Sequence, residues 1–359
     1  MNRIYITDCE GPISKNDNAY ELAEKLIPEG ATLFTILSKY DDIQVEIVKR
    51  PGYKPGDTLK LILPFLKAYG ATDEVIRRFS AEGILLVPGA AETLRDLSKL
   101  MPSYIVSTSY QHYIESLCEI VGFPKDNSYS TRLELDRFKI SNSEAMKIRE
   151  WANILVKRTP PKIPRGASSL EDLDERDKET VKFLDKMFWS DMRTMSVWQI
   201  LSNVNPIGGT EKVEAVKDII RKNKSEVANV IYFGDSITDS APLKYVRENG
   251  GVAVSFNGNE YAVREAEFAV LSENTLVTTI LATTFSKGGK NAVERLVSKW
   301  SFKAIEEFTG TNLRIKAEAI YRLGLPQIEI VTENNIERVT EKSCQFRIKV
   351  RGEAVGRLG

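Results

Sequence analysis

The sequence predicts an α/β fold built around a mostly parallel sheet. Short apolar runs alternate with helical segments along much of the 359 residues, a pattern typical of parallel strands joined by helices. Three runs stop at chemically active side chains: residues 3–7 at Asp8, residues 104–106 at Ser107, and residues 230–233 at Gly234-Asp235. In open α/β sheets ligands bind at the carboxyl ends of the strands, so this edge is the expected site.

The first part of the chain is expected to contain strands flanked by helices. Two Pro-Gly pairs interrupt a long helical stretch at residues 16–82, which includes a short extended piece at 42–48. A helix follows Pro88-Gly89, because proline is favoured at helix starts. The expected elements are a strand at 3–7, helices within 16–82, a helix at 90–100, a strand at 104–107, a helix at 110–121 and an edge strand at 129–135.

Residues 141–203 depart from this alternation and are expected to form a helical insertion. A proline-rich basic loop at 157–165 could be a solvated linker, or it could bind an anion or a partner. Ser168 and Glu171 predict a capping box at the start of the helix that follows. The remaining expected elements are a helix at 212–222, strands at 230–233, 252–256 and 268–271, helices at 291–308 and 317–323, and strands at 327–331 and 345–350.

Composition narrows the class of protein. Basic and acidic residues number 50 each, which argues against a nucleic-acid or anionic membrane surface as the main binding partner. Three cysteines without a CxxC pair fit a reducing compartment, and a single histidine, His112, argues against a zinc site. A strand-like start and apolar runs too short for a bilayer predict a cytoplasmic protein without a signal peptide.

The side chains at the strand ends suit phosphoryl transfer. Asp8 and Glu10 are two residues apart, so in an extended segment they point the same way. Asp8 would attack phosphorus and form an aspartyl-phosphate, while Glu10 would protonate the leaving oxygen and later deprotonate water. Ser107 would donate a hydrogen bond to a phosphoryl oxygen.

A phosphoryl group needs positive partners. Lys212 supplies one, and Mg²⁺ is expected as the other, held by Asp8, the backbone carbonyl of Glu10 and Asp235. Asp239 would complete the metal site by orienting Lys212 or a metal-bound water. Plainer interpretations stay open, because Ser107, Asp235 and Asp239 could each cap a helix.

In this order the motifs resemble those of the haloacid dehalogenase superfamily, and within it the phosphoserine-phosphatase-like branch. The family's first motif, Asp-x-Asp, is Asp-x-Glu-Gly in branches such as the enolase-phosphatases, and here it is Asp8-Cys9-Glu10-Gly11. The second is a strand-ending Ser or Thr, the third a lysine that opens a helix, and the fourth Gly-Asp-x-x-x-Asp. Their counterparts are Ser107, Lys212, and Gly234-Asp235 with Asp239. The layout also resembles a group of uncharacterised archaeal proteins.

The resemblance implies a Rossmann-like three-layer core made of residues 1–14, 83–140 and 204–280. Residues 15–82 would form a mobile helical cap that closes over the site and selects the substrate. Residues 141–203 would be an insertion and 281–359 an α+β extension. Implied substrate contacts are Asp17, Thr108, Ser109 and Asn257. Ile62 stands where phosphoserine phosphatases use an arginine, which counts against phosphoserine as the substrate.

The expected function is therefore Mg²⁺-dependent hydrolysis of a small phosphorylated metabolite through an aspartyl-phosphate. The large extra segments leave open a catalytically silent binding or assembly subunit with the same fold. Phosphotransfer to an acceptor other than water is a second alternative. A homodimer formed through residues 281–359 is the expected assembly, with neither nucleic acid nor membrane as a partner.

Overall fold

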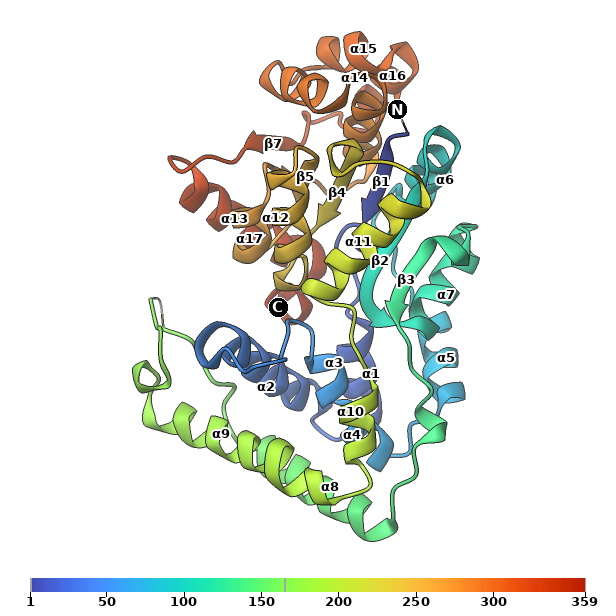
Figure 1. The fold of residues 1–359 in the computed structure, drawn as a ribbon. Coiled ribbons are helices and arrows are strands. Elements are labelled where there is room, and N and C mark those ends of the chain that lie inside the picture. Colours follow the sequence, from blue (N-terminus) through green and yellow to red (C-terminus); the bar gives the residue numbers. More distant parts are fainter. Residues whose placement is uncertain (1, 165, 359) are drawn as a thin grey trace.

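A seven-stranded sheet organises the molecule (Figure 1). The computed structural model describes residues 2–164 and 166–358. The strand order is β3-β2-β1-β4-β5-β6-β7, and only β6 and β7 pair antiparallel. The strands are β1 (Ile4–Thr7), β2 (Ser103–Tyr110), β3 (Ser128–Thr131), β4 (Val230–Gly234), β5 (Val252–Phe256), β6 (Phe268–Leu271) and β7 (Gln327–Ile330). This arrangement confirms the predicted α/β fold class.

The sheet is the middle of three layers, as β1 illustrates. All four of its residues are buried, and side chains alternate between the two faces of a strand. Tyr5 packs into the hydrophobic cluster of one face, and Ile4 and Ile6 pack into that of the other. The first face is covered by α6 (Ala90–Leu100), α7 (Gln111–Val121) and α14 (Leu276–Ser298), and the second by α11 (Thr210–Lys222) and α12 (Ser240–Glu248).

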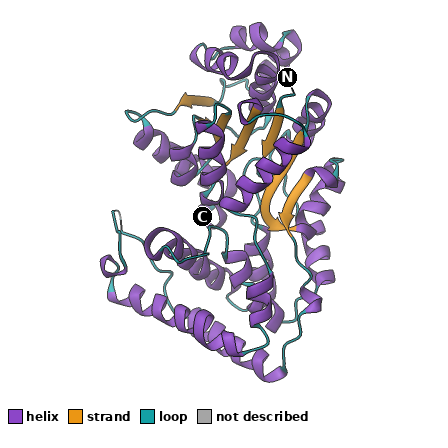
Figure 2. Cartoon of the chain, viewed as in Figure 1, coloured by secondary structure: helices purple, strands orange, loops and turns teal. Residues whose placement is uncertain are grey.

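The segments that follow β1 and β3 build one helical module, which lies below the sheet in Figures 1 and 2. Buried apolar side chains from residues 15–82 and 141–203 form one cluster; for example, the rings of Phe65 and Phe188 lie 6.3 Å apart. The two segments, expected as separate units, therefore share a hydrophobic core. The helices are α1 (Asn18–Leu26), α2 (Gly30–Ile43), α3 (Thr58–Leu61), α4 (Leu63–Ala68), α5 (Asp73–Glu82), α8 (Asn142–Leu155), α9 (Glu175–Lys186) and α10 (Trp198–Asn203).

Two local predictions within this module are wrong. Residues 42–48 are not extended but form the end of α2 and a π-helical turn, η1 (Gln44–Val48). Ile43 and Ile47, about one turn apart, are both buried in the module core. The capping box forms one residue later than expected, at Ser169 and Asp172, and it begins a 3-10 turn rather than α9.

The C-terminal region returns to the centre of the molecule. After a bend in α14 at Gly289, the chain forms α15 (Phe302–Thr309) and α16 (Thr311–Ile320). β7 then joins the edge of the core sheet. The chain ends in α17 (Ile336–Arg351) and α18 (Glu353–Gly356), which bring the C-terminus between the sheet and the helical module (Figure 1).

The strand predicted at 345–350 is wrong, because these residues belong to α17. The buried side chains of α17 recur every four residues, at Val339, Ser343 and Arg347, which is the spacing of one helix face. Two of the three are polar, so the inner face does not stand out as an apolar stripe.

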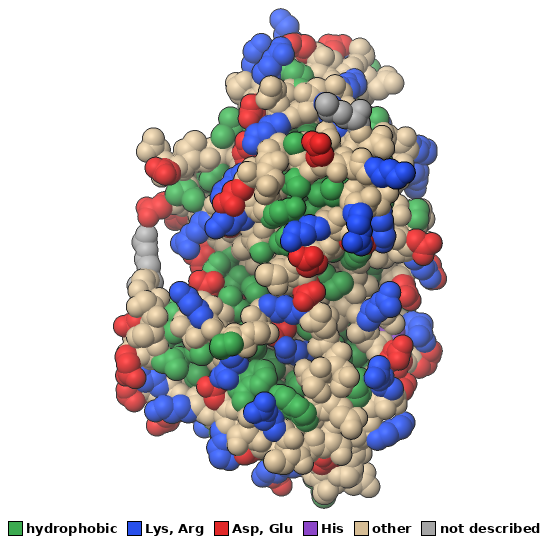
Figure 3. Space-filling view, in the orientation of Figure 1, with side chains coloured by type: hydrophobic (Ala, Val, Ile, Leu, Met, Phe, Trp, Pro, Cys, Tyr) green, Lys and Arg blue, Asp and Glu red, His purple; other side chains and the backbone are tan. Residues whose placement is uncertain are grey.

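The surface carries both signs of charge. Figure 3 shows basic and acidic side chains interspersed over the face drawn. Among the helices of the described residues, none combines the length and the apolar character that crossing a membrane requires.

Candidate active site

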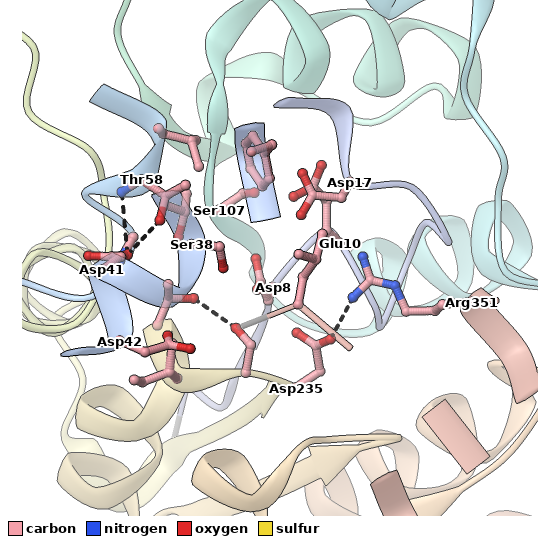
Figure 4. Close-up of a pocket in the computed structure, with 18 of the residues that line it drawn as sticks. Asp8, Glu10, Asp17, Ser38, Asp41, Asp42, Thr58, Ser107, Asp235 and Arg351 are labelled. Carbon is pink, nitrogen blue, oxygen red and sulfur yellow. Dashed lines mark hydrogen bonds and ion pairs between the residues drawn. The ribbon is translucent and has the colours of Figure 1, made fainter. Parts of the chain in front are cut away.

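Neighbouring strands place acidic and hydroxyl side chains around one cavity (Figure 4). Asp8 directly follows β1 and Asp235 directly follows β4, while Ser107 lies within β2. Because β1 pairs with both β2 and β4, these side chains come together at the carboxyl edge of the sheet. Ser107 sits in a register irregularity of β2, where the strand was expected to end.

Lys212 is completely buried in the first turn of α11, between two carboxylates. Its Nζ lies 2.9 Å from Asp8 Oδ2 and 2.7 Å from Asp239 Oδ1. A cation near a helix N-terminus is opposed by the helix dipole, and burial alone would lower the pKa of Lys212. The charges of Asp239 and Asp8 outweigh burial and raise this pKa, so the side chain is an ammonium ion.

Asp239 has both carboxylate oxygens engaged. Oδ1 accepts hydrogen bonds from Lys212 and from the Tyr232 hydroxyl at 2.7 Å. Oδ2 accepts from the backbone N–H groups of Asp235 at 3.1 Å and Ser236 at 3.3 Å. Burial would raise the pKa of Asp239, but Lys212 and Tyr232 hold it below its usual value. These bonds suit Asp239 to orienting Lys212 more than to binding a cation directly.

Asp8 and Asp235 offer the oxygens that a divalent cation would need. One carboxylate oxygen from each of Asp8, Asp235 and Asp239 lies within 4.8 Å of the others. Burial, followed by the charge of Asp239, raises the pKa of Asp8 well above its usual value, and Lys212 offsets this only in part. Oxygen donors are what Mg²⁺ prefers, and a cation there would relieve the repulsion, so the residues present fit this ion.

The turn after β1 brings the backbone against Asp235. Gly11 has a φ of +104°, and a Cβ atom at this position would lie 2.2 Å from Asp235 Oδ2. Both the left-handed backbone and the close approach require glycine. The glycine of the first motif is therefore explained by contact with the carboxylate of the fourth.

Glu10 lies beside Asp17 on the same side of the cavity. Glu10 Oε1 accepts a hydrogen bond from the Asn18 N–H at 2.8 Å, and Asp17 Oδ1 caps α1 by accepting from the Tyr20 N–H at 3.0 Å. Burial, followed by the charge of Asp17, raises the pKa of Glu10 well above its usual value. Such a shift suits a carboxyl group that must carry a proton near neutral pH.

The helical module forms the opposite wall of the cavity, and sequence reasoning did not find its residues. Ser38, Asp41 and Asp42 come from α2, and Thr58 comes from α3. Their helical pattern resembles that of ordinary surface positions, so no signal in the sequence set them apart.

The module is closed against the core in this structure. A Cβ atom added at Gly208 would lie 2.0 Å from the Pro55 carbonyl oxygen, and Lys54 Nζ lies 3.0 Å from Glu211 Oε1. The Tyr110 hydroxyl donates a hydrogen bond of 2.5 Å to the Leu59 carbonyl. The cavity beside these contacts measures about 90 Å³.

Two of the four implied substrate contacts line the cavity. These are Asp17 and Thr108, whose hydroxyl donates to the Ile207 carbonyl at 2.9 Å. Ser109 and Asn257 are not among the lining residues. The Asn257 amide instead exchanges hydrogen bonds of 2.8 and 2.9 Å with the backbone of Ser272, which ties the loops after β5 and β6 together.

Two arginines of α17 also line the cavity and were not predicted. Arg347 and Arg351 both contact Asp235 Oδ2, Arg351 at 3.1 Å. The one sequence signal for them is a spacing of four residues, which puts two side chains on the same face of a helix.

Among known proteins, this chain has similar solved structures. No family model matches the chain, and no curated protein matches it. The structure of gene product AF1437 from Archaeoglobus fulgidus is 25% identical with a TM-score of 0.81, and the match covers 100% of this chain and 99% of that one.

Two structures of phosphoserine phosphatase give weaker matches. A substrate-bound complex is 13% identical with a TM-score of 0.47, and a phospho-aspartyl intermediate analogue is 12% identical with a TM-score of 0.46. Each match covers 78% of this chain and 97% of the other. The chain thus resembles the Archaeoglobus fulgidus protein along its whole length, and its sheet order with a helical module after β1 is the three-layer α/β fold that the sequence predicts.

Proposed function

We propose that the protein is a Mg²⁺-dependent phosphohydrolase of the Asp-x-Glu-Gly, phosphoserine-phosphatase-like branch, acting on a small phosphomonoester through an aspartyl-phosphate. The observation that carries the proposal is the buried contact of Lys212 with Asp8 and Asp239, beside Asp235. A nucleophile, an ammonium group and further carboxylates meet at the edge of the sheet where a phosphoryl group could contact all of them.

In the first step Asp8 acts as the nucleophile. One of its carboxylate oxygens forms a bond to phosphorus while the bond from phosphorus to the leaving oxygen breaks. Glu10 gives its proton to that oxygen, so the product departs as an alcohol. Lys212 balances charge on the phosphoryl oxygens, and the Ser107 hydroxyl donates a hydrogen bond to one of them.

In the second step water hydrolyses the aspartyl-phosphate. Glu10, now a carboxylate, takes a proton from the water whose oxygen bonds to phosphorus. The bond between phosphorus and Asp8 breaks, which restores the Asp8 carboxylate and releases inorganic phosphate. Asp239 keeps Lys212 in place throughout, because its oxygens are held by Tyr232 and by the backbone of the fourth motif.

Asp8, Asp235 and the backbone carbonyl of Glu10 would hold the Mg²⁺ ion. Bound Mg²⁺ supplies positive charge to the oxygens of the transferred group. Asp239 would not bind the ion directly, since its own oxygens already accept hydrogen bonds, but would hold the neighbouring groups in place.

The small volume of the cavity favours a small substrate. One buried water needs roughly 10–15 Å³ by this kind of measure, so about 90 Å³ has room for a phosphoryl group and a few further atoms. The hydroxyl and carboxyl groups of Ser38, Thr58 and Asp17 on the wall favour a polar leaving group over an apolar one.

The test is a phosphatase screen over small metabolite phosphates, run beside Asp8→Asn. We expect phosphate release by the unaltered protein, loss on the order of 10³-fold or more in Asp8→Asn, and reversible loss on chelation of Mg²⁺. Asp126→Asn is the matched control, because Asp126 lies on the exposed surface of the sheet domain. This variant should keep its activity.

Two outcomes would count against the proposal. Turnover retained by Asp8→Asn would remove the aspartyl-phosphate mechanism. No turnover on the whole panel, together with a stable partner that co-purifies, would favour the alternative of a silent assembly subunit.

A further inference from the structure

Helix α17 places two arginines against Asp235, the carboxylate of the cluster that is not paired with Lys212. Their side chains are almost fully buried, with 3% of Arg347 and 4% of Arg351 exposed. Arg347 Nη1 contacts Asp235 Oδ2 and also donates to the Asp235 backbone carbonyl at 3.1 Å. Arg351 Nη1 donates to the same Oδ2 at 3.1 Å (Figure 4).

The same arginines tie Asp235 to two other parts of the chain. Arg347 Nε donates to the Gly356 carbonyl at 3.2 Å, which holds the C-terminal turn. Arg351 donates to the carbonyls of Lys15, at 3.1 Å, and Asn16, where the helical module leaves the core. A change in the position or charge of Asp235 would therefore alter the contacts of α17 and those of residues 15 and 16, where the chain passes from the sheet to the helical module.

The charge of Asp235 is countered by side chains of the protein itself. Lys212 is shared between Asp8 and Asp239, so the charge of Asp235 is met by the two guanidinium groups. Glu10 and Asp17 are the other acidic groups that line this side. A divalent cation bound to Asp235 would lie close to both arginines, and like charges repel strongly in a buried site.

We propose that Arg347 and Arg351 are positioning residues for Asp235 that oppose the binding of the divalent cation. They hold the carboxylate in place with positive charge from α17, and the cation must loosen them to bind. The inference rests on the Mg²⁺ site of the proposed function but not on its phosphatase chemistry. Coupling is reciprocal, so Mg²⁺ weakens the docking of α17 by the factor with which α17 weakens Mg²⁺ binding.

The first test is Mg²⁺ affinity measured by titration calorimetry on the full chain. Arg351→Met and Arg347→Met should bind Mg²⁺ at least tenfold more tightly than the unaltered protein. Arg351→Lys, which keeps the charge, should stay within a few-fold of it. Lys349→Met is the matched control, because Lys349 lies on the same helix but is 66% exposed and paired with Glu273; its Mg²⁺ affinity should not change.

The second test needs no variant. Hydrogen exchange of residues 336–351 in the unaltered protein should become at least tenfold faster when Mg²⁺ is saturating, even if Arg347→Met proves unable to fold. Unchanged or weaker Mg²⁺ affinity in Arg351→Met, or exchange that ignores Mg²⁺, overturns the inference. Neither test reads turnover, so a protein without phosphatase activity can still support it, and an active phosphatase can still refute it.

Discussion

Asp41 is a buried carboxyl on the helical-module side of the cavity. Its Oδ2 accepts hydrogen bonds from the Gly56 N–H at 3.0 Å and from the Thr58 hydroxyl at 2.8 Å. Burial, followed by the charges of Asp57 and Asp42, raises its pKa from the usual 3.8 to about 7. The charge of this wall of the cavity therefore changes near neutral pH.

Asp41→Asn should remove part of the pH dependence of stability. Between pH 4 and 7 the folded state keeps a proton on Asp41 that the unfolded state has released. The free energy of unfolding contributed by this group therefore falls as the pH rises, by up to about 4 kcal/mol. Urea unfolding at pH 5 and pH 8 should show a larger loss in the unaltered protein than in Asp41→Asn; parallel losses would contradict the assigned shift.

Single residues differ in how well the sequence revealed them. Asp8, Ser107 and Asp235 could be singled out because apolar strand runs lead into them, and Lys212 because it opens a helix at a suitable spacing. Asp41 could not, because it lies on a helix where an acidic residue is ordinary. Its burial and its hydrogen bonds with Thr58 come from the tertiary fold, which local periodicity does not report.

The turn that follows β1 shows how an element depends on one glycine. Gly11 and Gly52 both have positive φ values, +104° and +75°. A Cβ atom at Gly11 would lie 2.2 Å from Asp235 Oδ2, whereas a Cβ at Gly52 would meet no atom within 4 Å. Comparing alanine variants at these two glycines therefore distinguishes the cost of backbone strain from the cost of a collision with Asp235.

Gly11→Ala should lose Mg²⁺ binding and more stability than Gly52→Ala. Strain alone costs about 1–2 kcal/mol for an L-residue in this conformation, and both variants incur it. Gly11→Ala must also displace Asp235, which moves a proposed ligand. Urea unfolding and Mg²⁺ titration of both variants would measure the difference, and equal effects would show that the turn does not position Asp235.

At the level of elements, the strands were easier to predict than α17. Continuous apolar runs mark β1 and β4 because both faces of these strands are buried. Residues 345–350 read as a strand-like run, yet they belong to a helix that buries Ser343 and Arg347. A helix whose inner face is polar lacks the apolar period that sequence reasoning relies on.

In the whole molecule, a helical module packs against the carboxyl edge of the sheet and forms one wall of the cavity. The contact between them is close at Gly208, where an added Cβ would meet the Pro55 carbonyl at 2.0 Å. Gly83, near the other end of the module, has room, since its nearest neighbour would be the Phe79 carbonyl at 3.5 Å. Closure of this kind would exclude water from the cavity, as the proposed phosphoryl transfer requires.

Gly208→Ala should wedge the module away from the core. Amide exchange in residues 51–58 should accelerate, and turnover should fall on the order of 10- to 100-fold, because small displacements of catalytic groups are costly. Gly83→Ala should leave both unchanged. Mass-spectrometric hydrogen exchange on the two variants decides the matter, and slow exchange in both would mean that this contact does not hold the module closed.

Local sequence patterns were enough to predict the α/β class, the ends of β1 and β4 and the acidic and basic residues that could act there. These follow from local patterns, because a buried strand and its polar end are neighbours along the chain. Only the folded chain reveals that residues 15–82 and 141–203 share one core and that α17 places Arg347 and Arg351 on Asp235. Such contacts join segments far apart in sequence, where the packing of one surface against another, rather than any local period, selects the arrangement.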